Sequence, residues 1–272
     1  MNGGKRMRLA MIQMNVVHDK QENLTHAREL LRQAAREGID LAVLPEMFCC
    51  PYSNRFFRAY GEEEGAVGWT ALSQIARELR IYLVGGSMPE LAGGKVYNTS
   101  YVFDREGRQI AKHRKIHLFD IDVEGGQRFR ESAVLSPGDQ ITVFDTEFGK
   151  IGLCICFDFR FQELAKAMAD RGAQLVVVPA AFNMTTGPAH WELLFRMRAV
   201  DNQIFTLGTA PARNEAEKYV SYANSILADP WGTVLARAGV DEEILLAEID
   251  FAQNEAIRRQ FPIRSARRGD LY

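Results

Sequence analysis

The sequence is poor in several features that mark whole classes of protein. Its 272 residues hold four cysteines, in two close pairs, Cys49–Cys50 and Cys154–Cys156. A small secreted domain would need a wider spread of cysteines to build a disulfide framework. No apolar run reaches the roughly 18 residues that a membrane helix needs. We therefore expect a cytoplasmic protein with reduced thiols and no membrane partner.

An excess of charge of one sign is also lacking. Lysine and arginine number 33 against 35 aspartate and glutamate, so the net charge is -2, and nothing in it points to a nucleic-acid partner. The N-terminal segment MNGGKRMRLAMIQM places basic residues before an apolar stretch. That stretch is short and has no small-residue cleavage site, so we do not expect a signal peptide.

Short apolar runs alternate with amphipathic segments along the chain. The pattern predicts helices over 20–37, 69–79, 161–170 and 188–202, and strands over 9–14, 41–44, 81–84, 97–103, 109–112, 141–145, 150–155, 175–178, 204–209, 225–228, 234–236 and 244–249. Two passages, RLAMIQM-helix-LAVLPE and KIGLCIC-helix-LVVVPAAFN, repeat one order of elements. Their apolar strands indicate sheets covered on both faces. We predict one α/β domain over 1–272, built from two related halves, with a surface helix and tail after Phe251.

Three passages place reactive side chains just beyond strand ends, where α/β folds hold their sites. The first is Glu46, directly after the buried strand 41–44. Burial raises the pKa of a carboxyl group, which suits a general base near neutral pH. For this residue alone, a solvated loop glutamate is the more common case.

The second passage is His113-Arg114-Lys115-Ile116-His117, followed by an apolar pair and an acid. In a dry site the Lys115 ammonium can hold a developing oxyanion. The alternative is a solvated basic edge. The spacing of the two histidines could suggest a metal, but no helical signal or third ligand supports one.

The third passage is Cys154-Ile155-Cys156-Phe157, where a strand turns into a predicted helix. A thiol at a helix N-terminus ionises more easily, so Cys156 is the candidate nucleophile and the Phe157 N–H a candidate oxyanion donor. Cys154 is expected to be a buried small residue, and a structural role is the more frequent one for any single cysteine. The C-C and C-x-C spacings are poor for zinc. No Gly-x-Ser-x-Gly elbow, P-loop or dinucleotide fingerprint competes.

Taken together, LPEMF, HRKIHLFD and CICFDFRFQE resemble the Glu-Lys-Cys triad of the nitrilase (carbon–nitrogen hydrolase) superfamily. The stretches KIHLFDIDV, RESAVLSPGD, AAFNMTTGPAHWELL, RAVDNQ, PAR and GDLY resemble its Nit2-type ω-amidase branch. The resemblance covers nearly the whole chain. It implies a four-layer αββα sandwich and homodimers that stack through the helices next to the nucleophile. We expect the tail from about 251 to pack on a partner subunit, and no cofactor or metal.

The resemblance also implies a reaction. Cys156 attacks an amide carbonyl, Glu46 moves the proton to the leaving ammonia, and Lys115 with the Phe157 N–H holds the oxyanion. A thioester forms and is hydrolysed. The ω-amidases act on small α-keto acid monoamides such as α-ketoglutaramate and α-ketosuccinamate.

Further residues are expected to bind the substrate. Glu131 matches an additional glutamate near the lysine, and a surface glutamate beside Arg128 and Arg130 is the alternative. Arg160 could hold the substrate carboxylate, or it could form an ion pair with Asp158 that braces the nucleophile turn. The expected pocket walls and hydrogen-bond donors, on loops past strand ends, are Tyr52, Phe182 and Thr186.

Two departures from the family pattern leave the chemistry intact but bear on the substrate range: Cys154, where glycine is frequent, and the loop Met47-Phe48-Cys49-Cys50. Rival interpretations are an N-carbamoyl amidase, an aliphatic amidase or a nitrilase on the same scaffold. A non-catalytic binding protein would not need an intact triad. A Ser-His-Asp hydrolase would need an elbow motif that the sequence lacks.

Overall fold

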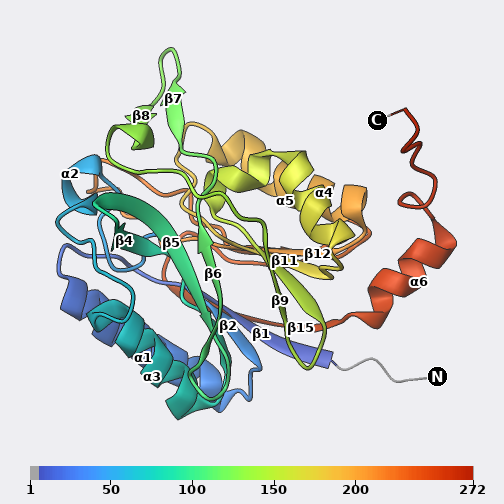
Figure 1. The fold of residues 1–272 in the computed structure, drawn as a ribbon, viewed down its shortest axis with the longest axis horizontal. Helices are drawn as coiled ribbons and strands as arrows, with labels where there is room; N and C mark the ends of the chain where they lie inside the picture. Colours follow the sequence, from blue (N-terminus) through green and yellow to red (C-terminus); the bar gives the residue numbers. More distant parts are fainter. Residues whose placement is uncertain (1–5, 272) are drawn as a thin grey trace.

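Two β-sheets lie face to face at the centre of the structure, a computed structural model that describes residues 6–271 (Figure 1). Residues 1–5 and 272, which include part of the basic N-terminal segment and the end of the GDLY motif, lie outside the described residues. Between residues 6 and 271, the structure contains no helix with the length and apolar character needed to cross a membrane.

The first sheet has seven strands and the second has six. In order across the first sheet these are β15 (Glu243–Asp250), β1 (Arg6–Gln13), β2 (Leu41–Val43), β3 (Tyr82–Val84), β5 (Lys95–Phe103) and β4 (Met88–Ala92), with β6 (Gln109–Arg114) also paired to β5. The second sheet contains β14 (Val234–Arg237), β13 (Ile226–Ala228), β12 (Phe205–Thr209), β11 (Leu175–Pro179), β10 (Lys150–Leu153) and β9 (Thr142–Asp145).

Helices cover the outer face of each sheet. On the first sheet these are α1 (Lys20–Arg36) and α3 (Val67–Leu79), and on the second they are α4 (Gln162–Asp170) and α5 (Gly187–Asn202). A third apolar layer lies between the sheets and draws residues such as Leu9 and Leu153 from both of them. The predicted four-layer αββα sandwich is therefore confirmed, and burial of both sheet faces explains why its central strands are apolar.

The two halves of the chain repeat the same strand–helix–strand unit. In the first half β1 pairs in parallel with β2, with Leu9 opposite Leu41, and α1 connects them. In the second half β10 pairs in parallel with β11, with Ile151 opposite Leu175, and α4 connects them. In both halves a second helix leads to a third parallel strand. Equivalent strand ends therefore meet at one edge of the sandwich.

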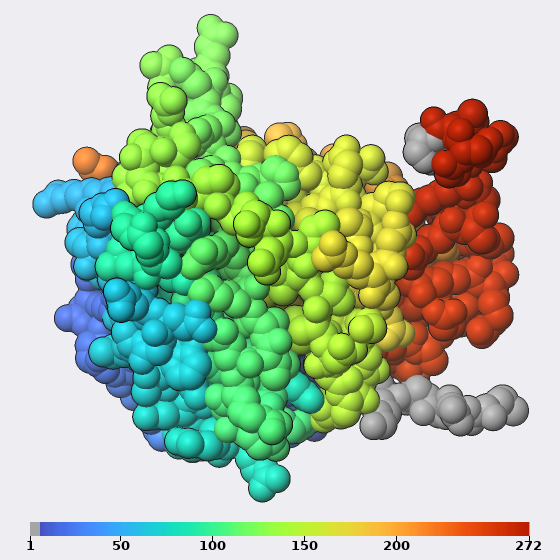
Figure 2. Space-filling model, in the orientation of Figure 1, coloured from blue at the N-terminus to red at the C-terminus, as the bar shows by residue number. Residues whose placement is uncertain are grey.

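The remaining elements are short or lie outside the sandwich. They are α2 (Asn54–Phe57), the hairpin β7 (Asp120–Asp122) and β8 (Arg128–Arg130), the 3-10 helices η1 (Glu131–Ala133) and η2 (Cys156–Arg160), and α6 (Ala252–Gln260). Figure 2 shows the β7–β8 hairpin and the segment after Phe251 standing out from the body. The sequence pattern did not predict β4, because it contains Pro89, or β7 and β8, because their few residues are polar and mostly exposed.

The layer between the sheets should dominate stability. Leu9→Ala removes a side chain with 0% exposure in that layer, and should lower the free energy of unfolding by about 2–5 kcal/mol. Leu246→Ala, on the adjacent strand β15 but 40% exposed, is the matched control and should cost less than about 1 kcal/mol. Urea unfolding of both variants measures the difference. Equal losses would contradict the assignment of the main core to this layer.

Candidate active site

Three strand ends bring Glu46, Lys115 and Cys156 together. Glu46 follows β2, Lys115 follows β6, and Cys156 follows β10. The Glu46 and Lys115 side chains are completely buried, and Cys156 is only 4% exposed. The Lys115 Nζ lies 2.9 Å from Glu46 Oε1, and the Cys156 thiol lies next to the Glu46 carboxylate. The structure thus places the predicted base, cation and nucleophile in one buried cluster.

The two oxygens of Glu46 have different surroundings. Oε1 accepts hydrogen bonds from Lys115 Nζ, from Asn98 Nδ2 at 2.9 Å and from the Tyr52 hydroxyl at 3.3 Å. Within residues 6–271, Oε2 is a buried atom without a hydrogen-bond partner. Because a buried carboxylate oxygen needs a donor, Oε2 is the oxygen available to the Cys156 thiol proton.

Burial controls the proton affinity of both groups. It raises the pKa of Glu46 despite the opposing charge of Lys115, as the sequence predicted for a base in an apolar setting. It also raises the pKa of Cys156 well above its usual range, and the Glu46 charge adds to this effect. The expectation of an easily ionised thiol at a helix N-terminus is wrong. Cys156 begins the short 3-10 helix η2, α4 starts only at Gln162, and the thiol is buried.

The nucleophile turn has an unusual backbone. Cys156 has φ = +46°, in the left-handed region that costs a non-glycine residue about 1–3 kcal/mol. This conformation leaves the Phe157 N–H without an acceptor among the described residues. The predicted oxyanion donor is therefore open to a ligand next to the thiol.

Lys115 is held between two carboxylates. Its Nζ lies 3.0 Å from Glu131 Oε1 as well as 2.9 Å from Glu46. Burial alone would lower the pKa of Lys115, but the charges of Glu131 and Glu46 outweigh burial and raise it, so the ammonium form is favoured. Glu131 is fully buried and also accepts from the Tyr52 hydroxyl at 2.6 Å and the Phe119 N–H at 2.7 Å. The alternative of a surface glutamate is wrong, because the β7–β8 hairpin folds Glu131 inward.

Arg160 makes no ion pair with Asp158, so that alternative is also wrong. Its guanidinium lies over the Phe182 ring at 4.6 Å and the Phe157 ring at 5.6 Å, and hydrogen-bonds His190 at 2.9 Å. Within the described chain no carboxylate pairs with it. Burial lowers the pKa of Arg160, and the neighbouring Cys156 and Tyr219 side chains oppose this effect. The structure thus holds a partly buried cation near the nucleophile whose charge has no carboxylate partner.

The other predicted pocket residues lie in different places. Tyr52 is in the cluster, stacked on Tyr219 at 4.3 Å. Phe182 lies under the Arg160 guanidinium and packs on Trp191 at 4.9 Å, so it is also part of the core. Thr186 donates its N–H and hydroxyl to Asn183 Oδ1 at the start of α5. No hydrogen bond joins Thr186 to the triad within residues 6–271.

Two residues that the sequence analysis missed belong to the site. Asn98, on β5, donates to Glu46, and its buried amide in an apolar strand was a readable signal. Tyr219 stacks on Tyr52 and donates its hydroxyl to the Ala181 carbonyl. It comes from a polar loop without periodicity, so no sequence signal marked it.

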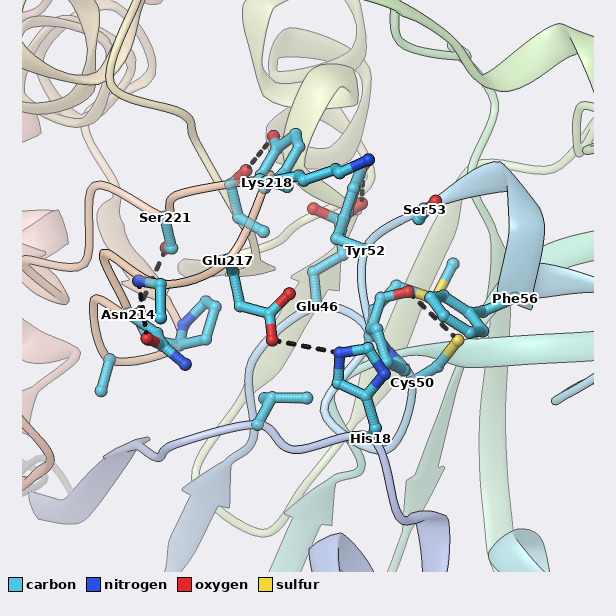
Figure 3. A pocket seen from close by; sticks show the side chains of 18 of the residues that line it. His18, Glu46, Cys50, Tyr52, Ser53, Phe56, Asn214, Glu217, Lys218 and Ser221 are labelled. Carbon is cyan, nitrogen blue, oxygen red and sulfur yellow. Dashed lines mark hydrogen bonds and ion pairs between the residues drawn. The ribbon is translucent and has the colours of Figure 1, made fainter.

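A cavity of about 380 Å³ leads to the site (Figure 3). Its wall includes Glu46 and Tyr52 at the triad, and Met47 and Cys50 from the loop that departs from the family pattern. On the outer side the partly exposed side chains of His18 and Glu217 face each other at 3.1 Å (Figure 3). The volume suits a small molecule.

Comparisons with known proteins show which chains this one is similar to. The family model for Carbon-nitrogen hydrolase matches residues 8–259. The chain is 51% identical to "Omega-amidase NIT2" of Mus musculus over 97% of this chain and 96% of that protein. It is 49% identical to "Omega-amidase NIT2" of Homo sapiens, with the same shares covered.

Solved structures share the fold. Nit3 of Saccharomyces cerevisiae, a member of branch 10 of the nitrilase superfamily, superposes with a TM-score of 0.90 at 41% identity, with 98% of each chain covered. An amidase of Nesterenkonia sp. AN1, with an acetamide moiety bound covalently at its active-site cysteine, superposes with a TM-score of 0.81 at 26% identity, covering 100% of this chain and 97% of that one. The chain belongs to the carbon–nitrogen hydrolase family of the nitrilase superfamily.

Proposed function

We propose that the protein is an ω-amidase that hydrolyses the terminal amide of small dicarboxylic acid monoamides through a thioester on Cys156. The observation that carries this proposal is the Glu46 carboxylate, held by Lys115 on one oxygen with Cys156 beside it. The named ω-amidases, at about half identity over nearly the full length, support the substrate class. α-Ketoglutaramate and α-ketosuccinamate are the expected substrates.

In the first half of the reaction, Cys156 Sγ attacks the amide carbonyl carbon while Glu46 takes the thiol proton. The raised pKa of both groups keeps this proton on sulfur at rest and lets it move as the new bond forms. Lys115 Nζ and the Phe157 N–H hold the oxyanion. Glu46 then gives the proton to the leaving nitrogen, and ammonia departs.

In the second half, Glu46 takes a proton from water, and the resulting hydroxide attacks the thioester carbonyl. The same donors hold the second oxyanion. The C–S bond breaks, and the Cys156 sulfur recovers its proton from Glu46. Glu131 keeps Lys115 charged and in place through both halves, since their side-chain atoms are 3.0 Å apart.

We assign the far carboxylate of the substrate to Arg160. Its guanidinium is partly buried and has no carboxylate partner in the described chain, so a substrate carboxylate would supply the missing charge. The Phe182 ring lies beneath the guanidinium and supports it.

A homodimer or higher homo-oligomer is part of the proposal. Leu193 and Met197 on α5 are exposed apolar residues next to the nucleophile helices, where a second sandwich could stack. The tail contacts its own chain through Arg264 and Asp170, and it also carries an exposed Phe261 that suits a partner surface. The cytoplasmic location stays a prediction.

Replacing the nucleophile should abolish turnover. Cys156→Ala should release no ammonia above background from α-ketoglutaramate and form no covalent adduct by mass spectrometry. Cys154→Ala, two residues earlier and equally buried, is the matched control and should keep activity within about threefold. Full amidase activity in Cys156→Ala would overturn the mechanism. Turnover of a carbamoyl amino acid or a nitrile instead of the keto-acid amide would overturn the substrate class.

Replacing the carboxylate-binding cation should change substrate preference. Arg160→Lys loses the bidentate fork, and a lost hydrogen bond to a charged group costs about 1.5–3 kcal/mol. KM for α-ketoglutaramate should therefore rise by about 10- to 100-fold, while an uncharged amide serves as the internal control and changes little. Equal effects on both amides would show that Arg160 supports the fold of the turn rather than the substrate.

The base should set the acid limb of the pH profile. Glu46 must be ionised to accept the thiol proton, so kcat/KM should fall as the pH drops through its pKa. Because burial raises that pKa, the fall should begin above the range of an ordinary glutamate. Glu46→Gln should lower kcat/KM by about 10²- to 10⁴-fold and remove this limb. An unchanged acid limb in the variant would assign the titration to another group.

A further inference from the structure

Asp158 is a buried carboxylate that the reaction itself does not use. Its Oδ1 accepts hydrogen bonds from the backbone N–H groups of Ile116 (3.1 Å) and His117 (2.8 Å), and from His117 Nδ1 (2.9 Å). Its Oδ2 accepts from His113 Nε2 (2.9 Å) and the Ile155 N–H (3.1 Å). Both oxygens are therefore fully engaged, and the side chain has 0% exposure.

The donors to this carboxylate come from two catalytic segments. Residues 113–117 surround Lys115, at the end of β6 in the first sheet. Ile155 belongs to the turn that carries Cys156, after β10 in the second sheet. Among the hydrogen bonds of the described residues, those of Asp158 are the ones that join these two segments. The Asp158 carboxylate therefore links the segment that carries the oxyanion-binding lysine to the turn that carries the nucleophile.

The same residue closes the strained turn. The Asp158 N–H donates to the Ile155 carbonyl at 3.0 Å, and the Ile155 N–H donates back to Asp158 Oδ2. Cys156, with its left-handed φ, and Phe157, with its open N–H, lie between these two bonds. Reciprocal bonds across four residues hold a backbone conformation that would otherwise relax.

Asp158 is suited to hold its neighbours rather than to move protons. Burial would raise its pKa, but the hydrogen bonds from His113 and His117 outweigh burial and lower it, so the ionised form is favoured. With both oxygens taken by donors, it has no free site for the Cys156 proton. On its outer side the His117 ring is stacked on Phe161 at 3.7 Å, which fixes that donor.

We propose that Asp158 is a positioning residue, clamped by His113 and His117, that sets the placement of Lys115 and the Phe157 N–H relative to Cys156 and so builds the oxyanion site. This inference rests on the proposed thioester mechanism. A misplacement of about 1 Å in such a site costs on the order of 100-fold in rate.

The first test compares Asp158→Asn with Asp104→Asn. Asp104 is a matched control because it is also buried and accepts the backbone N–H groups of Glu106 and Arg108, in a hairpin turn at the far end of β5 and β6. Asp158→Asn should lower kcat for α-ketoglutaramate by about 100-fold, with KM within about threefold of wild type. Asp104→Asn should keep kcat within about threefold.

A second measurement separates positioning from loss of folded enzyme. Alkylation of Cys156 by iodoacetamide needs the thiol and Glu46 but forms no oxyanion. In Asp158→Asn it should slow by less than about fivefold, while hydrolysis falls about 100-fold. Equal losses of alkylation and hydrolysis would indicate a structural role and overturn the inference. Failure of wild-type enzyme to release ammonia would instead overturn the proposed function.

The third test uses His117, which remains informative if Asp158→Asn does not fold. His117→Phe keeps the ring stacked on Phe161 but loses the donor, and should lower kcat about tenfold. His117→Asn keeps a donor near the Nδ1 position and should restore kcat to within about threefold of wild type. Wild-type kcat in His117→Phe, or equal losses in both variants, would contradict the proposed role of the His117–Asp158 hydrogen bond.

Discussion

The structure depends on one buried ammonium group, Lys115, between two buried carboxylates. Removing the ammonium or either carboxylate leaves an uncompensated charge in the buried interior. The free-energy cost of that charge is far larger than the net stabilisation that the contacts provide. The surrounding groups follow from this constraint. Asn98 and Tyr52 donate to the same oxygens that Lys115 contacts, Oε1 of Glu46 and Oε1 of Glu131, and the Phe119 N–H donates to the second oxygen of Glu131. The hairpin and η1 are needed because they deliver Glu131 to this position.

The doubled architecture explains how such a cluster can exist. The first sheet supplies Glu46 and Lys115 from the ends of β2 and β6, and the second supplies Cys156 from the end of β10. The apolar layer between the sheets holds these strand ends at a fixed distance from each other. Low dielectric then raises the proton affinity of Cys156 and Glu46 together. The site is therefore a property of the packed pair of sheets, since neither half contains it alone.

Local sequence patterns were sufficient for most of the fold and for the triad. Apolar runs of four to seven residues marked the central strands, and amphipathic periods marked α1, α3 and α4, because these elements obey local spacing rules. Order along the chain could not show that Asp158 would bind two histidines instead of Arg160. Nor could it show that Thr186 would bond Asn183 or that Tyr219 would stack on Tyr52, since those contacts depend on how distant loops meet. The ionisation of Cys156 was misjudged because a helix was assumed to begin there, and burial was underestimated.

The protonated state of Cys156 has a consequence for chemical damage. Peroxides and disulfides react with thiolates, and a thiol whose pKa is raised by burial presents little thiolate to them. Only 4% of Cys156 is exposed, so burial also limits the access of oxidants to its sulfur. A reactive nucleophile thus exists mainly during catalysis, when Glu46 draws off the proton as the carbonyl arrives. Such an arrangement limits the reaction of the sulfur with oxidants while no substrate carbonyl is present.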